Sequence, residues 1–245
     1  MPTIDEKRVY TDESGTETVY LATGLGVVSA SVSDDLIGEF GVVRRGRARD
    51  VATAGPYVAA ATDDDVLVCD RRAGVGSDAD AAGDDGATDR TGGDGGFAPT
   101  GFGPATAVGF RDGAVVAGDD VGRVGRSDPA AGTADGAEWT DLGAVDAVRA
   151  VDGDFVAAAD GVHRIGGSGL QPVGLDDARD VDAEPLVAAG SGLYALGNGW
   201  MRRLAGPATA ADAAGGRGLA VRAGDLYARE GCRRAGAPRV PPADD

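Results

Sequence analysis

The 245-residue chain has very few lysine, histidine and aromatic residues. It contains one lysine, Lys7, and one histidine, His163, and aromatic residues make up 5% of it. A single histidine gives a Ser-His-Asp triad only one candidate base, and no Gly-x-Ser-x-Gly turn accompanies it. Because aromatic side chains are so scarce, we expect a thin core of small aliphatic residues.

Metal-ligand and phosphate-binding patterns are missing as well. The two cysteines, Cys69 and Cys232, form no Cys-x-x-Cys pair, which argues against a zinc site and a disulfide framework and favours free thiols. The Gly-rich stretches lack the Gly-Lys-Ser/Thr ending of a phosphate-binding loop. We therefore predict no catalytic, cofactor-binding or metal-binding residue and no cofactor.

Long apolar runs and excess positive charge are also absent. The first ten residues are charged where a secretory signal is apolar, and no run approaches the length of a membrane span, so we expect a cytoplasmic protein. The formal net charge is −17. Such a surface repels phosphates, so neither nucleic acid nor a membrane is an expected partner.

What the chain does contain is aspartate and glycine. Of the 40 acidic residues 33 are aspartate, and 42 residues are glycine. Short, strongly hydrated carboxylates combined with almost no lysine are typical of proteins adapted to molar salt, where the charge repulsion is screened. An acidic protein encoded by a GC-rich genome is the alternative interpretation.

The strongest internal signal is a repeat of short apolar strands joined by polar turns. Three clear copies share a Val-Ala-Ala core followed by a turn and a second strand, and they begin at Tyr57, Phe155 and Leu186. Three weaker copies begin at Val19, Ala114 and Leu219. Six copies of one supersecondary unit predict a repeat architecture.

Further strand-forming segments precede the copies. Ala48–Val51 and Ala178–Val181 read as a strand before the hairpin, and Trp139–Gly143 and Leu170–Leu175 supply a fourth strand. These units predict an all-β fold, a β-propeller of about six short four-stranded blades, in which Ala-rich strands suit the crowded region near the axis. A β-sandwich with coincidental repetition is the alternative.

We expect one domain. Residues 1–231 form the propeller, and residues 73–96, rich in Gly and Asp, form a disordered insertion loop. The strand pattern stops at residue 231, and the Pro-rich residues 232–245 are expected to be an unstructured tail. Two interpretations stay open: a propeller left incomplete at its C-terminus by truncation or a frame shift, or a natural tail on a shorter ring.

A family resemblance covers about residues 15–230. It rests on four segments taken together, Ala48–Ala52, Pro99–Ala105, Val173–Val181 and Leu193–Trp200. The combination resembles a haloarchaeal β-propeller family of unknown function. The resemblance implies the fold and a salt-rich habitat, and it implies no reaction, cofactor or ligand.

The function expected from these observations is a non-catalytic protein-interaction scaffold, monomeric, with an unidentified protein partner. The candidate contact residues are two large anchors and local basic residues: Trp139, Trp200, Arg44, Arg45, Arg202 and Arg203. Packing of both tryptophans inside the blades is the alternative. A second hypothesis is an enzyme or small-ligand binder that uses aspartates at the channel mouth with a divalent cation. A cluster of three or more carboxylates directed at the axis would reverse the preference for the scaffold.

The remaining polar candidates have simpler explanations. His163 takes the place that Tyr194 has in the next repeat, which indicates a strand position, and Asn198 lies in an Asn-Gly turn. Aspartate clusters at residues 63–65, 119–120 and 176–177 fall on expected turns and lack EF-hand spacing.

Overall fold

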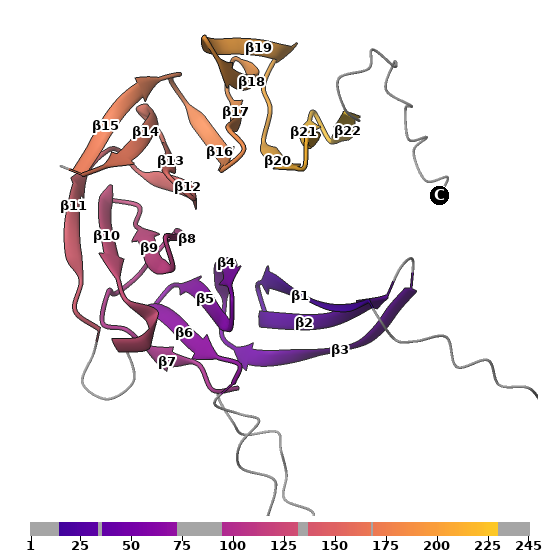
Figure 1. Cartoon of the computed structure of the whole chain (residues 1–245), viewed down its shortest axis with the longest axis vertical. Coiled ribbons are helices and arrows are strands. Elements are labelled where there is room, and N and C mark those ends of the chain that lie inside the picture. The colour runs from indigo at the N-terminus through magenta and orange to yellow at the C-terminus, as the bar shows by residue number, and fades with distance from the viewer. Residues whose placement is uncertain (1–14, 34–35, 73–94, 132–136, 168, 230–245) are drawn as a thin grey trace, which may run out of the picture.

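The structure is a computed structural model that describes residues 15–33, 36–72, 95–131, 137–167 and 169–229. It is all-β, with six antiparallel sheets arranged as blades around an axis, so the predicted six-bladed β-propeller is confirmed (Figure 1). Of the loop expected at 73–96, residues 73–94 lie outside the described residues, whereas Gly95 and Gly96 form a turn before β7; the tail expected at 232–245 also lies outside them. One short 3-10 turn, η2 (Pro129–Ala131), is the only helical segment in the described part.

The middle four blades have four strands each, and the first and last have three in the described residues. Blade 1 comprises β1 (Thr16–Thr23), β2 (Gly26–Ser33) and β3 (Leu36–Arg45). Blade 2 comprises β4 (Ala48–Ala54), β5 (Tyr57–Thr62), β6 (Val66–Asp70) and β7 (Ala98–Pro99). Blade 3 comprises β8 (Ala107–Arg111), β9 (Ala114–Gly118), β10 (Arg123–Ser127) and β11 (Thr140–Ala144).

The carboxyl-terminal half continues the same order. Blade 4 comprises β12 (Val148–Asp152), β13 (Phe155–Ala158), β14 (Gly161–Gly166) and β15 (Gly169–Gly174). Blade 5 comprises β16 (Ala178–Asp182), β17 (Leu186–Ala189), β18 (Gly192–Gly197) and β19 (Gly199–Ala205). Blade 6 comprises β20 (Ala210–Ala214), β21 (Arg217–Arg222) and β22 (Asp225–Arg229).

The core lies between neighbouring blades, in one apolar cluster for each interface. Between blades 4 and 5, for example, Ala157 and Val162 pack against Val181 and Val187. The Val-Ala-Ala strands are buried along their whole length, as β13 and β17 show. Alanine and valine allow two twisted sheets to approach closely, which explains why so few aromatic residues suffice.

The strand nearest the axis is not the Val-Ala-Ala strand. The contacts between blades run through β4, β8, β12, β16 and β20, which makes these the innermost strands, and β5, β13 and β17 come second. A shift in register near the start of β4, β12 and β16 marks a β-bulge in each. The extra residue bends these strands and re-aims the Asp50 and Asp180 side chains.

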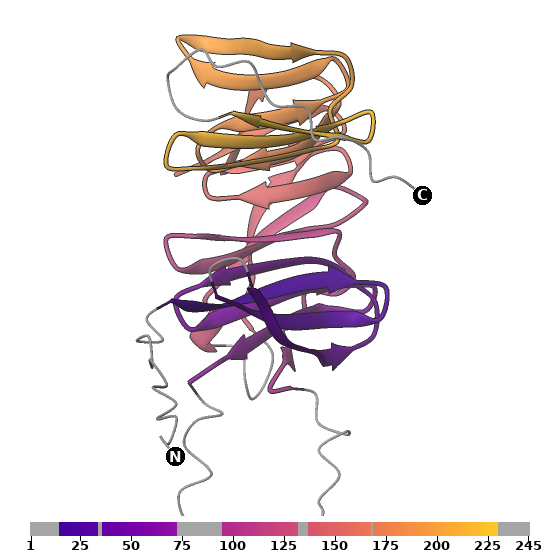
Figure 2. The same cartoon turned by 90° about the vertical axis from the view of Figure 1, so that its right-hand side faces the viewer.

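The described residues leave the ring open between blade 6 and blade 1. β1 pairs only with β2 and β22 only with β21, and the contacts between innermost strands stop at β20. Figure 2 faces this opening, with blade 1 in indigo below the gold and yellow strands of blades 5 and 6. We call this gap the ring opening.

Register shows which strands border the ring opening. β14 and β18 are each the third strand of their blade, counted from the axis. Each starts with a glycine, and its pairing with the outermost strand shifts register, after Val162 in β14 and after Leu193 in β18. β2 does the same, starting at Gly26 and shifting after Val27. β2 is therefore a third strand and β1 a second strand, so the described blade 1 has no innermost strand and the described blade 6 no outermost strand.

No helix in the described part of the chain is long and apolar enough to cross a membrane.

Candidate functional site

The ring opening has an apolar wall on its blade 1 side. One face of blade 1 packs on blade 2 through Tyr20, Ala22 and Val43. Residues opposite one another in antiparallel strands share a face, and the pairs Leu21↔Val28, Val28↔Val42 and Ala30↔Phe40 lie on the other one. We define the blade 1 wall as Val19, Leu21, Val28, Ile37, Phe40 and Val42.

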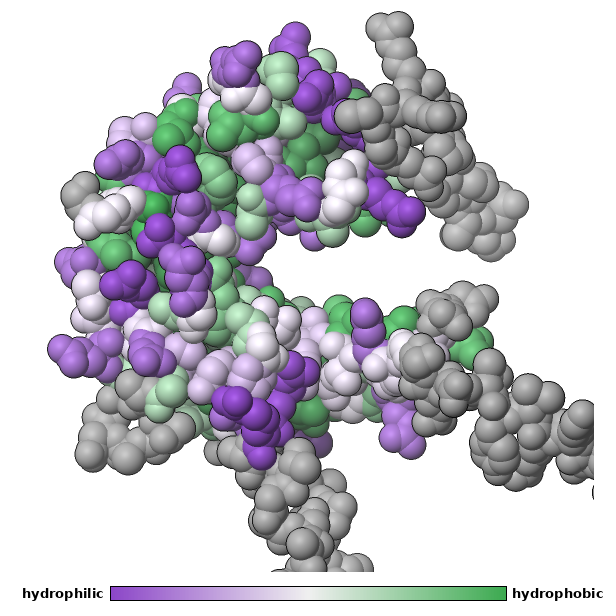
Figure 3. All heavy atoms as spheres, viewed as in Figure 1, coloured by the Kyte–Doolittle hydropathy of each residue, from purple (hydrophilic) through white to green (hydrophobic). Residues whose placement is uncertain are grey.

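The blade 1 wall is open to solvent. Ile37 and Phe40 are 75% and 77% exposed, and Val19, Leu21 and Val42 are also exposed. The space-filling view shows a notch between the two ends of the ring, with hydrophobic residues in green along its blade 1 side (Figure 3). A contiguous exposed apolar face of this kind is unusual on a soluble monomer and typical of interaction sites.

Blade 6 supplies the opposite wall. Ala211, Ala213 and Ala220 pack on blade 5, and the other face carries the cross-strand pairs Val221↔Leu226 and Leu219↔Ala228. Leu219 and Leu226 are exposed. We define the blade 6 wall as Leu219, Val221, Leu226 and Ala228.

A second candidate site is the polar cavity at the axis, about 660 Å³ in volume. Arginines and threonines share its lining with six aspartates: Asp50, Asp112, Asp152, Asp180, Asp182 and Asp212. Acidic side chains therefore do gather at the axis. The described residues nevertheless contain no group of three or more His, Cys, Asp or Glu arranged to hold a metal ion.

Two of the axial carboxylates hold adjacent blades together. Asp50 accepts hydrogen bonds from the backbone N–H groups of Val51 (2.8 Å) and, in the next blade, Val108 (2.9 Å). Asp180 does the same with Val181 (3.0 Å) and Ala211 (2.9 Å). Burial raises the pKa of each carboxyl to about 6, although these N–H groups oppose the shift.

Further carboxylates repeat this contact between blades. Asp152 accepts a hydrogen bond from the backbone N–H of Ala183 in blade 5 at 2.9 Å. Burial raises the pKa of Asp182, while the backbone N–H groups of Ala213 in blade 6 and of Glu184 oppose that shift. Since these four axial carboxylates, Asp50, Asp152, Asp180 and Asp182, already accept backbone hydrogen bonds, their clearest role is to fix one blade against the next.

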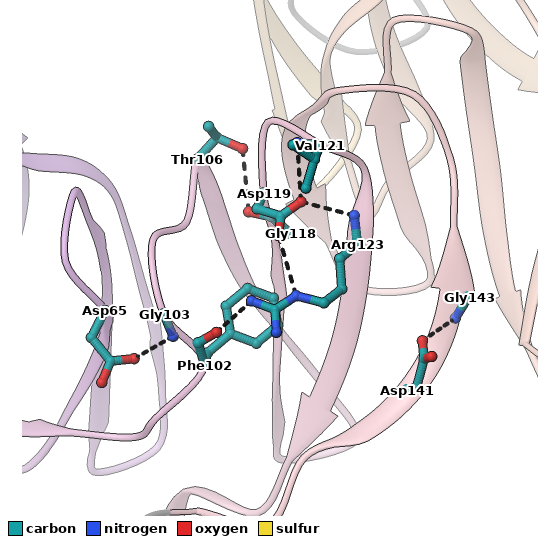
Figure 4. Close-up of polar contacts among 10 residues, drawn as sticks. All are labelled: Asp65, Phe102, Gly103, Thr106, Gly118, Asp119, Val121, Arg123, Asp141 and Gly143. Carbon is teal, nitrogen blue, oxygen red and sulfur yellow. Dashed lines mark hydrogen bonds and ion pairs between the residues drawn. The ribbon is translucent and has the colours of Figure 1, made fainter.

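The loops at one end of the axis form a comparable network between blades 2 and 3. Asp65 accepts hydrogen bonds from the backbone N–H groups of Gly101 (2.8 Å) and Gly103 (3.0 Å). Asp119 binds the Arg123 side chain, whose guanidinium stacks 4.0 Å from the Phe102 ring centroid. Figure 4 shows the hydrogen bond from Gly103 to Asp65 of blade 2 and, in blade 3, the Arg123 side chain between Asp119 and Phe102. The predicted turn aspartates are thus caps and blade-to-blade contacts.

Arginine–aspartate pairs continue the network at blades 4 and 5. Asp177 binds Arg149 (2.5 Å) and Arg179 (3.0 Å), and these two hydrogen bonds lower its pKa. A similar arginine–aspartate pair occurs in blade 2, where Arg49 of β4 binds Asp63.

The two tryptophans proposed as contact residues pack against the apolar clusters between neighbouring blades. Trp139 lies 4.6 Å from Phe102, ring centroid to ring centroid, and its Nε1–H donates to the Thr100 carbonyl oxygen at 3.2 Å. Trp200 packs on the blade 4–blade 5 core and donates to the Val173 carbonyl oxygen at 2.7 Å. Both side chains remain half-buried, and a role in partner contact stays a prediction.

The four arginines proposed as contact residues lie in outermost strands of two different blades. Arg44 and Arg45 are in β3, where the Arg44 guanidinium binds the Arg45 carbonyl oxygen. Arg202 and Arg203 are exposed in β19 of blade 5. The structure therefore does not bring the four together in one basic patch.

His163 and Asn198 agree with the simpler explanations. His163 is a buried residue of β14, and its Nε2 lies 3.0 Å from Asp160 Oδ1. Asn198 lies in the turn between β18 and β19. An incomplete ring implies exposed strand edges and apolar faces, but the residues of the apolar walls were not identified from the sequence, because their alternation resembles that of any strand covered on both faces.

The comparisons with known proteins agree with the fold. The chain belongs to the family described as "Beta-prop_HVO_0234:-like, beta propeller", whose family model matches residues 3–241, so the expected family resemblance is confirmed. No curated protein matches the chain.

Solved structures show the propeller fold at low identity. A chain of the nidogen/laminin complex has a TM-score of 0.58 and 10% identity, with 87% of this chain and 89% of that chain covered. U3-55K has a TM-score of 0.55 and 12% identity, covering 86% and 73%. The computationally designed Ika8 protein has a TM-score of 0.56 and 14% identity, covering 86% and 67%. At such identities the likeness concerns the fold alone.

Proposed function

We propose that this protein is a non-catalytic interaction scaffold that binds a protein partner in the ring opening. The observation that supports the proposal most strongly is the pair of exposed apolar walls on the two sides of that gap. Burying such apolar surface in a complex removes it from water, which favours association. The scaffold would act as a monomer in the salt-rich cytoplasm of a haloarchaeal cell, a setting supported by the net charge of −17 and the family.

A ligand or cation site in the axial cavity is the second candidate. The six aspartates around the cavity favour it. We prefer the scaffold because Asp50, Asp152 and Asp180 already bind backbone N–H groups of the following blade. A cation there would compete with contacts that position the blades.

Affinity capture with matched variants tests the scaffold. Tagged wild type, Phe40→Arg and Leu25→Arg are incubated with a lysate of a salt-adapted host in molar KCl. Phe40 lies in the blade 1 wall, whereas Leu25 is an equally exposed leucine in the β1–β2 turn. We expect one stoichiometric partner on wild type and on Leu25→Arg, and at least a tenfold loss on Phe40→Arg, because a charge then enters an apolar interface.

Circular dichroism and thermal melting of the three proteins control for folding. A partner that binds all three equally places the contact elsewhere, and recovery of no stoichiometric partner would count against the scaffold.

A further inference from the structure

The ring opening has two unpaired strand edges as well as apolar walls. β1, a second strand, has no innermost strand beside it in the described residues, and β22, a third strand, has no outermost strand. In the other blades an outermost strand leads directly into the innermost strand of the next blade, as β19 leads into β20. One extended segment with two strands therefore fits both edges.

Asp212 marks the place of the innermost strand. Asp152 in β12 and Asp182 in β16 each direct a carboxylate at a backbone N–H of the following blade, Ala183 and Ala213 respectively. Asp212 is the next member of this series, at the same spacing of 30 residues and on the innermost strand of blade 6. Among the described residues, no hydrogen bond joins its exposed carboxylate to another blade.

Asp225 marks the place of the outermost strand. Asp65 stands just before β6 and binds the backbone N–H groups of Gly101 and Gly103, which lie on the path from the outermost strand β7 to blade 3. Asp225 of blade 6 occupies the equivalent position. The cross-strand pair Val221↔Leu226 corresponds to Ala61↔Val66, and Asp225 directly precedes Leu226 as Asp65 directly precedes Val66. The Asp225 side chain is exposed, and within the described ranges it has no such backbone donor.

We propose that the ring opening is a strand-acceptor site that binds one extended segment of a partner polypeptide, which adds an outermost strand to β22 and an innermost strand to β1. Backbone pairing supplies the affinity, and small apolar side chains at alternate positions fill the space between the two walls. Basic residues in the segment complement Asp212, Asp225 and the net charge of −17. This inference rests on the proposed function and specifies its partner.

A peptide with the sequence of residues 199–214 is the probe. It contains β19 and β20, the outermost and innermost strands that occupy the equivalent place one blade earlier, and it carries Arg202 and Arg203. The dye-labelled peptide is titrated against the full chain in molar KCl and followed by fluorescence anisotropy. A scrambled peptide controls for charge and composition.

We expect saturable binding of the native peptide and at least tenfold weaker binding of the scrambled one. Leu21→Arg in the blade 1 wall should weaken binding at least tenfold, while Leu25→Arg should change it less than twofold. Asp212→Asn and Asp225→Asn should each weaken it several-fold, because a hydrogen bond to a charged acceptor is lost. Hydrogen exchange should show protection of β1 and β22 in the complex.

Equal binding of native and scrambled peptides, no binding, or protection confined to other strands would overturn the strand-acceptor site. These experiments distinguish a failure of the strand-acceptor proposal from a failure of the scaffold proposal. If the peptide does not bind but Phe40→Arg still releases a captured partner, the opening binds a folded surface and only the strand-acceptor site is wrong.

Discussion

Replacing Gly122 with alanine is expected to lower the free energy of unfolding by about 3–5 kcal/mol. Gly122 has a φ of +91°, and an added Cβ would lie far inside contact distance of the Val145 carbonyl oxygen. Val145 directly follows the outermost strand β11, so the chain there lies close to the start of the third strand β10. The equivalent glycines of blades 1, 4 and 5, which are Gly26, Gly161 and Gly192, face the same kind of carbonyl oxygen.

Gly113→Ala is the matched control. Gly113 has a φ of +81° in a turn, with nothing within 4 Å of its added Cβ, so only the backbone strain of about 1–2 kcal/mol applies. Chemical denaturation of the two variants in the same salt compares them. Equal losses of stability would show that the close approach of the outermost strand contributes nothing.

Replacing Asp50 with asparagine is expected to remove part of the pH dependence of stability. The pKa of Asp50 is raised from 3.8 to about 6 in the folded protein. Between these values the folded state keeps the proton that the unfolded state loses, so the contribution is fully present below about pH 4 and is lost as pH rises through 6. The stability of wild type relative to Asp50→Asn should therefore fall by up to about 3 kcal/mol between pH 4 and pH 7.

Asp154→Asn is a control in which the stability contribution of the carboxylate has the opposite pH dependence. Hydrogen bonds from Arg111 and Arg164 lower the pKa of Asp154, so its contribution is present above the unfolded pKa and is lost as the pH falls. Denaturant titrations at constant ionic strength measure Asp50→Asn from pH 4 to pH 7, and Asp154→Asn from pH 7 down to about pH 2, because the Asp154 contribution is lost only below its unfolded pKa. The same pH dependence in wild type and Asp50→Asn would contradict the burial of this carboxylate at the axis.

Much of the fold could be predicted from short-range patterns. The Val-Ala-Ala hairpins at Tyr57, Phe155 and Leu186 became β5–β6, β13–β14 and β17–β18, because alternating buried residues and polar turns determine strands locally. The order of strands from the axis was harder. It depends on which strand contacts the neighbouring blades, and Ala-rich composition suits both the first and the second position.

The interaction surface could not be predicted for a related reason. Leu21, Val28 and Phe40 alternate as they would in a strand covered on both sides, so the sequence does not show that one cover is missing. The two tryptophans were noticed because of their size, yet both donate hydrogen bonds to carbonyl oxygens of the neighbouring blade or the segment that follows it. These side chains are exposed because the described ring is open beside blade 1. That opening becomes visible only when all six blades are arranged in space.

Hydrogen exchange of the captured complex tests the central claim most directly. The protein is measured by mass spectrometry alone and with its recovered partner, in molar KCl. If the protein is such a scaffold, exchange should slow in β1–β3, β21 and β22, the strands that carry the two apolar walls. Protection confined to the axial strands β4, β8, β12 and β16 would contradict the claim and favour a site in the axial cavity.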